Sequence, residues 1–247
     1  MFKKGLKKIW RVCAALVSGV FWYSRDLFAY KKMLGKNKPG AFWFYPKIFD
    51  KDAASHTFDK HYVYMDRWAA KKIIAARPQE HLDVGSSIRF LSFVSAFVPL
   101  IFLDIRPVSL DFDNFRCMEG SVLKMPFESD SVKSLSCLHV AEHIGLGRYG
   151  DPLDPKGTMK ACRELERVLG LGGRLYFALP VGRPAIYFNA HRVHDPEQVL
   201  SYFPKLRLLG FSAVSDQGRF IRVAKIEDFK HARYACGMFE FAKDAKS

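Results

Sequence analysis

Short apolar runs alternate with helix-forming segments from residue 80 onward, and this alternation restricts the possible folds more than any other feature of the sequence. The runs are HLDV, PLIFLD, FRCME, SLSCL and RLYFALPV, at 81–84, 99–104, 115–119, 134–138 and 174–181. Runs of this length are typical of buried strands. Strands that alternate with helices predict an α/β fold, a doubly wound and mostly parallel sheet that binds ligands at the carboxyl ends of its strands.

The ends of the first two predicted strands carry a family resemblance. The first ends in Asp83-Val84-Gly85-Ser86-Ser87, and Asp104 ends the second, 21 positions later. With the segment RELERVLGLGGRLYFALPV, these motifs resemble class I S-adenosylmethionine-dependent methyltransferases, which have a Rossmann-like fold. More narrowly, HLDVGSSIRFLS, HVAEHIGLGRYGDPLDP and NAHRVHDP resemble an uncharacterised methyltransferase-like family, some members of which are associated with bacterial surface-glycan genes.

The resemblance implies a site for S-adenosyl-L-methionine. Gly85 would let the backbone approach the amino-acid part of the cofactor, because it has no Cβ. Asp104 would accept hydrogen bonds from the ribose hydroxyls. Ser121 would contact the adenine. The residues assigned to the cofactor are Asp83, Gly85, Ser87, Asp104, Ser121 and His139.

The glycine loop departs from the usual pattern, because Ser87 and Arg89 replace its second and third glycines. Two alternatives to a methyltransferase therefore stay open. One is a catalytically inactive protein of the same fold that acts as a membrane-tethered interaction module. The other is a dinucleotide-binding Rossmann domain that transfers hydride, although the loop after the first predicted strand lacks Gly-x-Gly-x-x-Gly.

Two histidines are candidates for the general base of the methyl transfer. An imidazole can be neutral at working pH and accept a proton from an oxygen acceptor. We assign this role to His143 and His191. His139-Val140-Ala141-Glu142-His143 also matches the H-x-x-E-H pattern of inverted zinc peptidases, but the pattern needs both histidines on one helix, and His139 follows a predicted strand. We assign no metal site.

Two loops follow the fourth and fifth predicted strands, at 145–157 and 182–196, and both are rich in polar residues. They could hold a polyhydroxyl acceptor, such as a sugar or a lipid-linked glycan, or could be rigid surface loops with capping aspartates. Asp195 and Pro196 predict the start of a helix. The residues assigned to the acceptor are Arg148, Tyr149, Asp151, Asn189, Arg192 and His194.

The net charge of +14 is concentrated at the N-terminus. Residues 1–38 hold ten Lys and Arg and one acid, a net charge of +9, which leaves +5 for the rest of the chain. This basic segment contains an apolar run of 12 residues, Val12–Tyr23, shorter than the 20 or so that span a bilayer. It favours a helix lying on an anionic membrane surface. A signal peptide, a spanning helix and a helix packed on the domain are the alternatives.

The remaining features define the expected organisation. Five scattered cysteines without a CxxC pair indicate reduced thiols in the cytoplasm, where the protein would be peripheral at the membrane's cytoplasmic face. No zinc finger, helix-turn-helix or RNP-like motif indicates a nucleic-acid partner. We expect four parts: a basic amphipathic segment (1–38), an aromatic linker and helix (39–77), a methyltransferase-like core (78–220) and a strand and helix tail (221–247).

Overall fold

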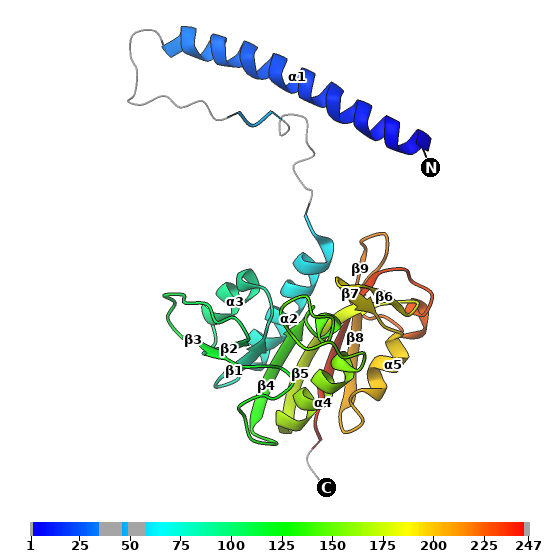
Figure 1. Ribbon diagram of the computed structural model, residues 1–247. Coiled ribbons are helices and arrows are strands. Elements are labelled where there is room, and N and C mark those ends of the chain that lie inside the picture. The colour runs from blue at the N-terminus through cyan, green and yellow to red at the C-terminus, as the bar shows by residue number, and fades with distance from the viewer. Residues whose placement is uncertain (1, 35–45, 49–57, 245–247) are drawn as a thin grey trace. The chain divides into compact units, whose positions relative to one another are not determined.

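The computed structural model describes residues 2–34, 46–48 and 58–244, and the chain divides into two units, Met1–Phe58 and Asp59–Ser247. The first unit contains one long helix, and the second contains the sheet and all other helices of the described residues (Figure 1). Most of the aromatic linker expected after residue 38 lies outside the described residues.

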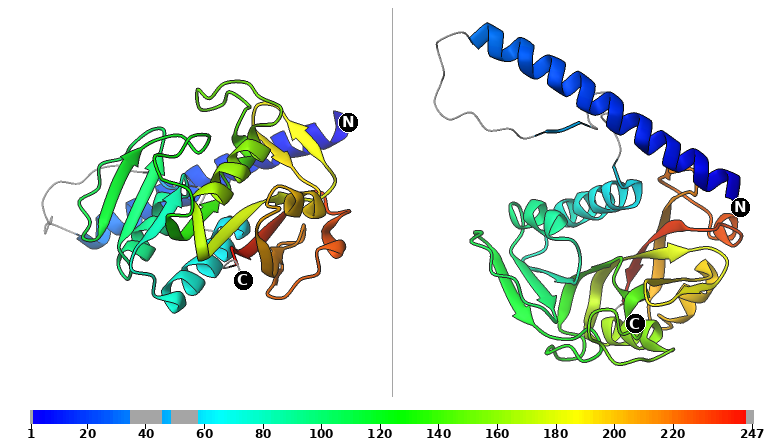
Figure 2. Two further views of the ribbon diagram at one scale, coloured as in Figure 1. Left: turned by 90° about the horizontal axis from the view of Figure 1, so that it is seen from below. Right: turned by 45° about the horizontal axis from the view of Figure 1, so that its top comes forward.

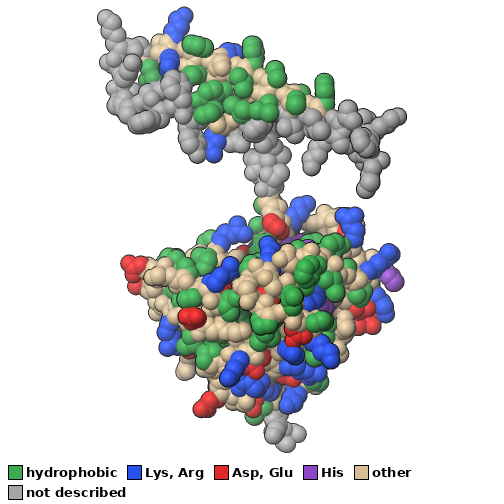
Figure 3. All heavy atoms as spheres, in the orientation of Figure 1, with side chains coloured by type: hydrophobic (Ala, Val, Ile, Leu, Met, Phe, Trp, Pro, Cys, Tyr) green, Lys and Arg blue, Asp and Glu red, His purple; other side chains and the backbone are tan. Residues whose placement is uncertain are grey.

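Helix α1, Phe2–Leu34, makes one continuous helix of the basic N-terminal segment and the apolar run. Hydrophobic side chains lie along it in Figure 3. The exposed residues of this helix include Val17, Phe21 and Phe28. In the parts of the chain that the structure describes, no helix is long and apolar enough to cross a membrane.

An eight-stranded sheet forms the centre of the second unit, with the strand order β3-β2-β1-β4-β5-β10-β8-β9 (Figure 1). Strands β1 to β5 pair in parallel, whereas β10 pairs antiparallel with both β5 and β8. The chain runs outward from β1 through β2 to β3 and then crosses back to place β4 on the other side of β1. The carboxyl ends of β1 and β4 therefore flank the point where such sheets bind ligands. The strands are β1 (His81–Val84), β2 (Leu100–Asp104), β3 (Phe115–Glu119), β4 (Val132–Leu138), β5 (Leu169–Val181), β8 (Arg207–Val214), β9 (Phe220–Ile221) and β10 (Ala235–Ala242).

Helices cover both faces of the sheet, as the views in Figure 2 show. Helices α2 (Lys60–Ala76) and α3 (Ile88–Ser95) pack on one face, through residues such as Trp68 and Leu91. Helices α4 (Gly157–Val168) and α5 (Pro196–Ser201) pack on the other face. The result is the three-layer, doubly wound α/β fold that the sequence predicts, with most strands parallel.

Short elements complete the edge of the sheet where the strands end. A single 3-10 turn, η1 (Ala141–His143), follows β4, and the hairpin of β6 (Ala185–Tyr187) and β7 (His191–Val193) follows β5. A second 3-10 turn, η2 (Glu227–Phe229), precedes β10. Asp195 caps α5 by accepting a hydrogen bond from the Glu197 amide, which confirms the predicted helix start.

Two expectations from the sequence need correction. Residues after 220 are not a tail: β10 is inserted between β5 and β8, so the core extends to residue 242. Helix α2 likewise belongs to the core unit rather than to a linker, because its apolar side packs on the sheet. Both elements have apolar faces that only contact with distant strands can bury.

Candidate functional site

A buried hydrogen-bond network fixes the first strand beneath the site. The Asp83 carboxylate accepts hydrogen bonds from the Ser86 amide (3.0 Å), the Ser86 hydroxyl (2.7 Å) and the Ser136 hydroxyl. His81 lies 2.7 Å from the Ser134 hydroxyl and 2.8 Å from that of Ser136. Burial raises the pKa of Asp83 to about 7 and lowers that of His81 to about 3. Asp83 therefore braces the glycine loop and does not line the cavity, contrary to its assignment to the cofactor.

The network also fixes the proton positions on His81. Because the single Ser136 hydroxyl hydrogen goes to Asp83, the Ser136 oxygen must accept a hydrogen bond from Nε2–H of His81. Nδ1 then accepts from the Ser134 hydroxyl. This arrangement uses neutral imidazole, in agreement with the lowered pKa of His81.

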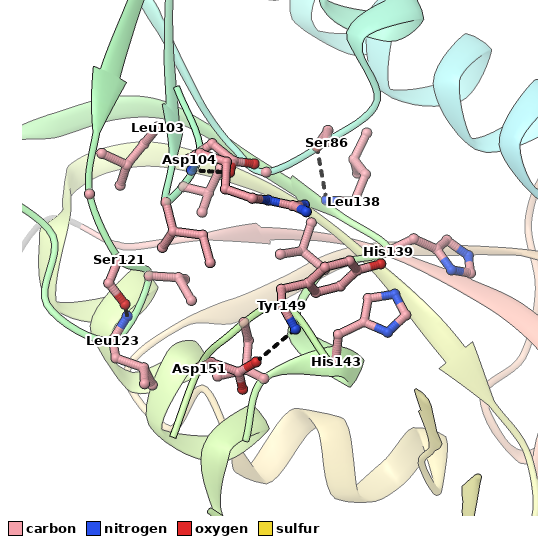
Figure 4. Close-up of a pocket in the computed structure, with 18 of the residues that line it drawn as sticks. Ser86, Leu103, Asp104, Ser121, Leu123, Leu138, His139, His143, Tyr149 and Asp151 are labelled. Carbon is pink, nitrogen blue, oxygen red and sulfur yellow. Dashed lines mark hydrogen bonds between the residues drawn. The ribbon is translucent and has the colours of Figure 1, made fainter. Parts of the chain in front are cut away.

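A cavity of about 210 Å³ lies at the ends of β1, β2 and β4 (Figure 4). Gly85 adopts a φ of +65°, and a Cβ there would lie 3.0 Å from a Val140 methyl carbon and 3.8 Å from Oδ2 of Asp104. Oδ1 of Asp104 accepts a hydrogen bond from the Arg106 amide (2.8 Å). The carboxylate is thus held by one oxygen, and the other lies beside the open backbone of Gly85.

Two other residues assigned to the cofactor, Ser121 and Ser87, line the first cavity, but the Ser87 hydroxyl is used to hold neighbouring structure. Ser121 lines the cavity, and its hydroxyl accepts a hydrogen bond from the Leu123 amide (Figure 4). Ser87 also lines it, but the Ser87 hydroxyl caps α3 through the Phe90 amide and donates to Asp66. The apolar part of the lining comprises Val84, Leu103, Ile105, Val122, Leu123, Leu138, Val140 and Ile144.

His139 and Glu142 form a buried ion pair at the exit of β4. His139 has a φ of +56°, and its Nδ1 lies 2.8 Å from Oε1 of Glu142. Burial by itself would lower the pKa of His139, but Cys236 and Glu142 outweigh it and raise that pKa well above 6.5. Burial raises and His139 lowers the pKa of Glu142, with a net decrease. The zinc-peptidase reading fails because η1 is a single 3-10 turn and not a helix carrying both histidines.

His143 lies between this first cavity and a second, polar one of about 310 Å³. Its Nδ1 lies 2.6 Å from the Ala190 carbonyl oxygen, which can only accept, so Nδ1 carries the proton. In the neutral ring, Nε2 is then the basic nitrogen. Figure 4 shows the His143 and Tyr149 rings beside one another, and their planes are nearly perpendicular, with centroids 5.6 Å apart.

The second cavity brings together histidines, tyrosines and charged groups. Burial lowers the pKa of His191, and it lowers that of His61 to about 4, so both rings are neutral near pH 7. Arg148 donates to the Ala190 carbonyl (3.2 Å) and lies over the Tyr149 ring. The lining comprises Asp59, His61, Tyr62, His139, Glu142, His143, Arg148, Tyr149, His191 and Tyr234.

Three of the residues assigned to the acceptor lie elsewhere. The buried Arg192 guanidinium donates to the carbonyls of Ile144 (2.6 Å) and Asp154 (3.1 Å), so it clamps the loop after η1. His194 is buried against the Tyr202 hydroxyl (3.2 Å). Asn189 is exposed and lines neither cavity. Among the other three, Tyr149 lines both cavities, Arg148 the second and Asp151 the first.

Sequence reasoning missed several residues that the fold brings to the site. His61 and Tyr62 come from the start of α2, Tyr234 precedes β10, and Cys236 lies within it. Arg106 lines the first cavity and lies 4.6 Å from the centre of the Tyr149 ring. No spacing in the sequence connects these positions. Glu142 alone gave a signal, as the acid of the H-x-x-E-H pattern.

Comparisons with known proteins agree with this architecture. Residues 119–219 match the family model described as "Caenorhabditis protein of unknown function, DUF268". No curated protein matches the chain. The N-methyltransferase NodS from Bradyrhizobium japonicum WM9, solved with S-adenosyl-L-homocysteine, is 11% identical, with a TM-score of 0.54 over 81% of this chain and 92% of NodS.

Two further solved structures show the range of proteins that share the fold. A putative sarcosine dimethylglycine methyltransferase from Galdieria sulphuraria is 17% identical, with a TM-score of 0.52 over 74% of this chain and 86% of that one. The [4+2]-cyclase SpnF is 14% identical, with a TM-score of 0.51 over 73% and 82%. Identities this low establish the fold alone. The chain therefore has the class I methyltransferase fold, and its segment 119–219 is similar to an uncharacterised family, as the sequence motifs predict.

Proposed function

We propose that this protein is an S-adenosylmethionine-dependent methyltransferase. The observation that carries the proposal is the pairing of Gly85 and Asp104 at the ends of β1 and β2. Gly85 leaves its backbone open to the cavity, and Asp104 keeps one carboxylate oxygen beside it. A carboxylate in this position can accept hydrogen bonds from a ribose diol, and the apolar lining fits an adenine ring. The NodS and Galdieria relatives support the general kind of activity.

The bound cofactor would supply an electrophilic methyl group on a sulfonium. On transfer, the methyl group would leave the sulfonium sulfur for the acceptor oxygen, and the acceptor hydroxyl would lose its proton. His143 lies where the two cavities meet, and Nε2 of the neutral ring can take that proton. The Glu142 carboxylate, 3.9 Å from Nε2, would stabilise the imidazolium that forms. His191, neutral and on the same cavity, is the second candidate base.

The second cavity supports a polyhydroxyl acceptor, such as a sugar or a lipid-linked glycan. Tyrosine rings can pack on the apolar face of a sugar, and histidine, arginine and carboxylate groups can hydrogen-bond its hydroxyls. Tyr149, Tyr234 and Arg148 lie on this cavity. Asp151 holds the loop by accepting from the Tyr149 amide.

Calorimetry with S-adenosylhomocysteine on the full chain tests cofactor binding. We expect saturable binding, weakened at least tenfold, about 1.4 kcal/mol, in Asp104→Ala. Asp113→Ala is the matched control, because Asp113 is exposed and lines neither cavity. Absence of heat at millimolar ligand, or equal affinity in the two variants, would exclude the proposal. Binding of a nicotinamide dinucleotide instead would indicate hydride transfer.

Transfer itself is tested with a methyl-labelled cofactor and a glycolipid extract as the acceptor source. We expect His143→Gln to lower the transfer rate at least a hundredfold without weakening cofactor binding. His231→Gln is the control, since His231 is exposed and outside both cavities. If the cofactor binds but no component of the extract is labelled, the result would favour the second candidate function, a non-catalytic interaction module. The cyclase SpnF shows that this fold does not by itself require methyl transfer, because it has the fold and another activity.

We also propose that residues 1–38 hold the protein at an anionic membrane surface, on the cytoplasmic side. The segment combines a charge of +9 with exposed apolar side chains on α1, including Phe21 and Phe28. Full-length protein should sediment with vesicles that contain an anionic phospholipid and less with neutral ones. Phe21→Glu with Phe28→Glu should abolish sedimentation, and Lys160→Glu, on the core, should not. Equal sedimentation of all three proteins would refute the anchor.

A further inference from the structure

Three metal-ligating side chains converge beside the second cavity, from three separate elements of the core. His61 lies in α2, His139 follows β4, and Cys236 lies in β10. One ligand atom from each lies within 4.8 Å of the other two. Among the described residues, no other group of histidine, cysteine and acidic side chains meets this condition.

The spacing of these atoms is close to that of a tetrahedral zinc site. Zinc bonds histidine nitrogen at about 2.0–2.1 Å and thiolate sulfur at about 2.3 Å, so neighbouring ligand atoms lie about 3.3–3.6 Å apart. Nε2 of His139 is already 3.2 Å from Sγ of Cys236. The His61 ring centre is 5.7 Å from that of His139, and small side-chain rotations would bring its nitrogen to bonding distance.

The Glu142 carboxylate orients the His139 ring from the side opposite Cys236. Nδ1 of His139 lies 2.8 Å from Oε1 of Glu142, which directs Nε2 toward Cys236. Metal-binding histidines characteristically donate their second N–H to a carboxylate in this way. Glu142 is 1% exposed, and its Oε2 has no hydrogen-bond partner among the described residues. A nearby cation would compensate such a buried charge.

Aromatic rings fix the two imidazoles. Tyr234 stacks on His61 with ring centres 5.2 Å apart, and Tyr62 lies 5.4 Å from the His139 ring. The φ of +56° at His139 places its side chain away from the direction that the strand would give it, and the His139 amide donates to the Ala178 carbonyl. A non-glycine residue in this conformation is uncommon and concentrates at functional sites.

We propose that His61, His139 and Cys236 bind one Zn²⁺ ion, with Glu142 as the residue that positions His139. Cys236 would bind as thiolate and His139 through Nε2 of its neutral ring, so zinc binding would release the Cys236 thiol proton and the Nε2 proton of the His139 imidazolium to solvent. Three protein ligands leave one coordination position, as in catalytic zinc sites. His61 and His139 both line the second cavity, so this position faces the space assigned to the acceptor. On the proposed function, the ion would bind an acceptor oxygen there and ease its deprotonation.

Metal content tests the site without any assay of activity. Full-length protein, purified without a metal column and dialysed against Zn²⁺ and then buffer, should hold about one zinc by mass spectrometry. His61→Ala and Cys236→Ala should each hold less than about a tenth of an equivalent. Cys13→Ser and His231→Ala, both at exposed positions, should match the wild type. Circular dichroism shows which variants are folded.

Two further measurements keep the test decisive. Co²⁺-loaded protein should show thiolate-to-cobalt charge-transfer absorption in the near ultraviolet, absent in Cys236→Ala. Glu142→Gln should keep zinc but bind it about tenfold to a hundredfold more weakly. The site is refuted by zinc below a tenth of an equivalent together with no cobalt spectrum, or by zinc content that none of the ligand variants changes. Calorimetry with S-adenosylhomocysteine on EDTA-treated protein separates this outcome from failure of the proposed function.

Discussion

The two cavities lie side by side and share Tyr62, His139, His143 and Tyr149, yet they are built differently. The first is formed by backbone and apolar side chains at the ends of β1, β2 and β4, with Asp104 as its fixed carboxylate. The second is formed by titratable and aromatic side chains from α2, η1, the following loop, β7 and the approach to β10. The lining of the first cavity is suited to selecting a nucleotide by its shape. The lining of the second is suited to binding polar groups and accepting protons from them.

The largest expected effect tests whether the second cavity depends on buried charge. Glu142→Gln breaks the buried pair with His139 and should lower the free energy of unfolding by about 3–5 kcal/mol, because an unpaired buried charge remains. Denaturant unfolding in EDTA measures this loss. Glu197→Gln is the control, since its partner Lys230 and Glu197 itself are about half exposed. Equal stability of the two variants would mean that His139 and Glu142 are not an ion pair.

The first cavity should instead be sensitive to backbone shape. Gly85→Val places a branched side chain at a φ of +65° against Val140, and it should weaken binding of S-adenosylhomocysteine about a hundredfold, or roughly 2.7 kcal/mol. Gly172→Val is the matched control, because Gly172 has a φ of +75° with nothing within 4 Å of its Cβ position. Calorimetry compares them. If both variants lost a similar amount of affinity, backbone strain at a positive φ would explain the effect, and the space that Gly85 leaves beside Val140 would not.

The network below the first cavity predicts two opposite pH dependences. Neutral His81 stabilises the fold above its ordinary pKa of 6.5, and this contribution is lost as the pH falls toward about 3. Protonated Asp83 stabilises the fold below 3.8, and this is lost as the pH rises toward about 7. Between about pH 4 and 6.5 the two slopes cancel in the wild type.

A substitution that removes one of the two groups should reveal the pH dependence of stability that the other group causes. Relative to the wild type, Asp83→Asn should become more stable with rising pH over that window, by up to about 1.4 kcal/mol per pH unit. His81→Gln should show the opposite slope. Chemical unfolding at several pH values measures both. Slopes of the same sign in the two variants would show that burial does not shift the pKa values of Asp83 and His81 in opposite directions.

The smallest expected effect concerns the contact between the two cavities. Arg106 lines the first cavity and lies over the Tyr149 ring of the second, 4.6 Å from its centre. Arg106→Ala should weaken S-adenosylhomocysteine binding about threefold, in line with about 0.5–1 kcal/mol for an exposed cation–π contact. Faster proteolysis between residues 145 and 156 should accompany it. Unchanged proteolysis would show that this contact does not order the loop.

The sequence predicted most of the first cavity because its residues follow local rules. Gly85 and Asp104 each end an apolar run, and parallel strands deliver their carboxyl ends to one edge. Asp83 was assigned to the same site because it adjoins Gly85, but strand alternation directs its side chain inward to Ser86 and Ser136. Arg192 was placed at the acceptor for its polarity, whereas three backbone carbonyls hold its guanidinium in the interior.

By itself the sequence determined the doubly wound sheet, the helix start at Asp195 and the basic N-terminal helix, because periodicity and capping act over a few residues. Only the tertiary structure decided that His61, His139 and Cys236 meet. The insertion of β10 between β5 and β8 and the packing of α2 on the sheet bring them together. Such contacts depend on how distant apolar faces are buried, which no local pattern encodes.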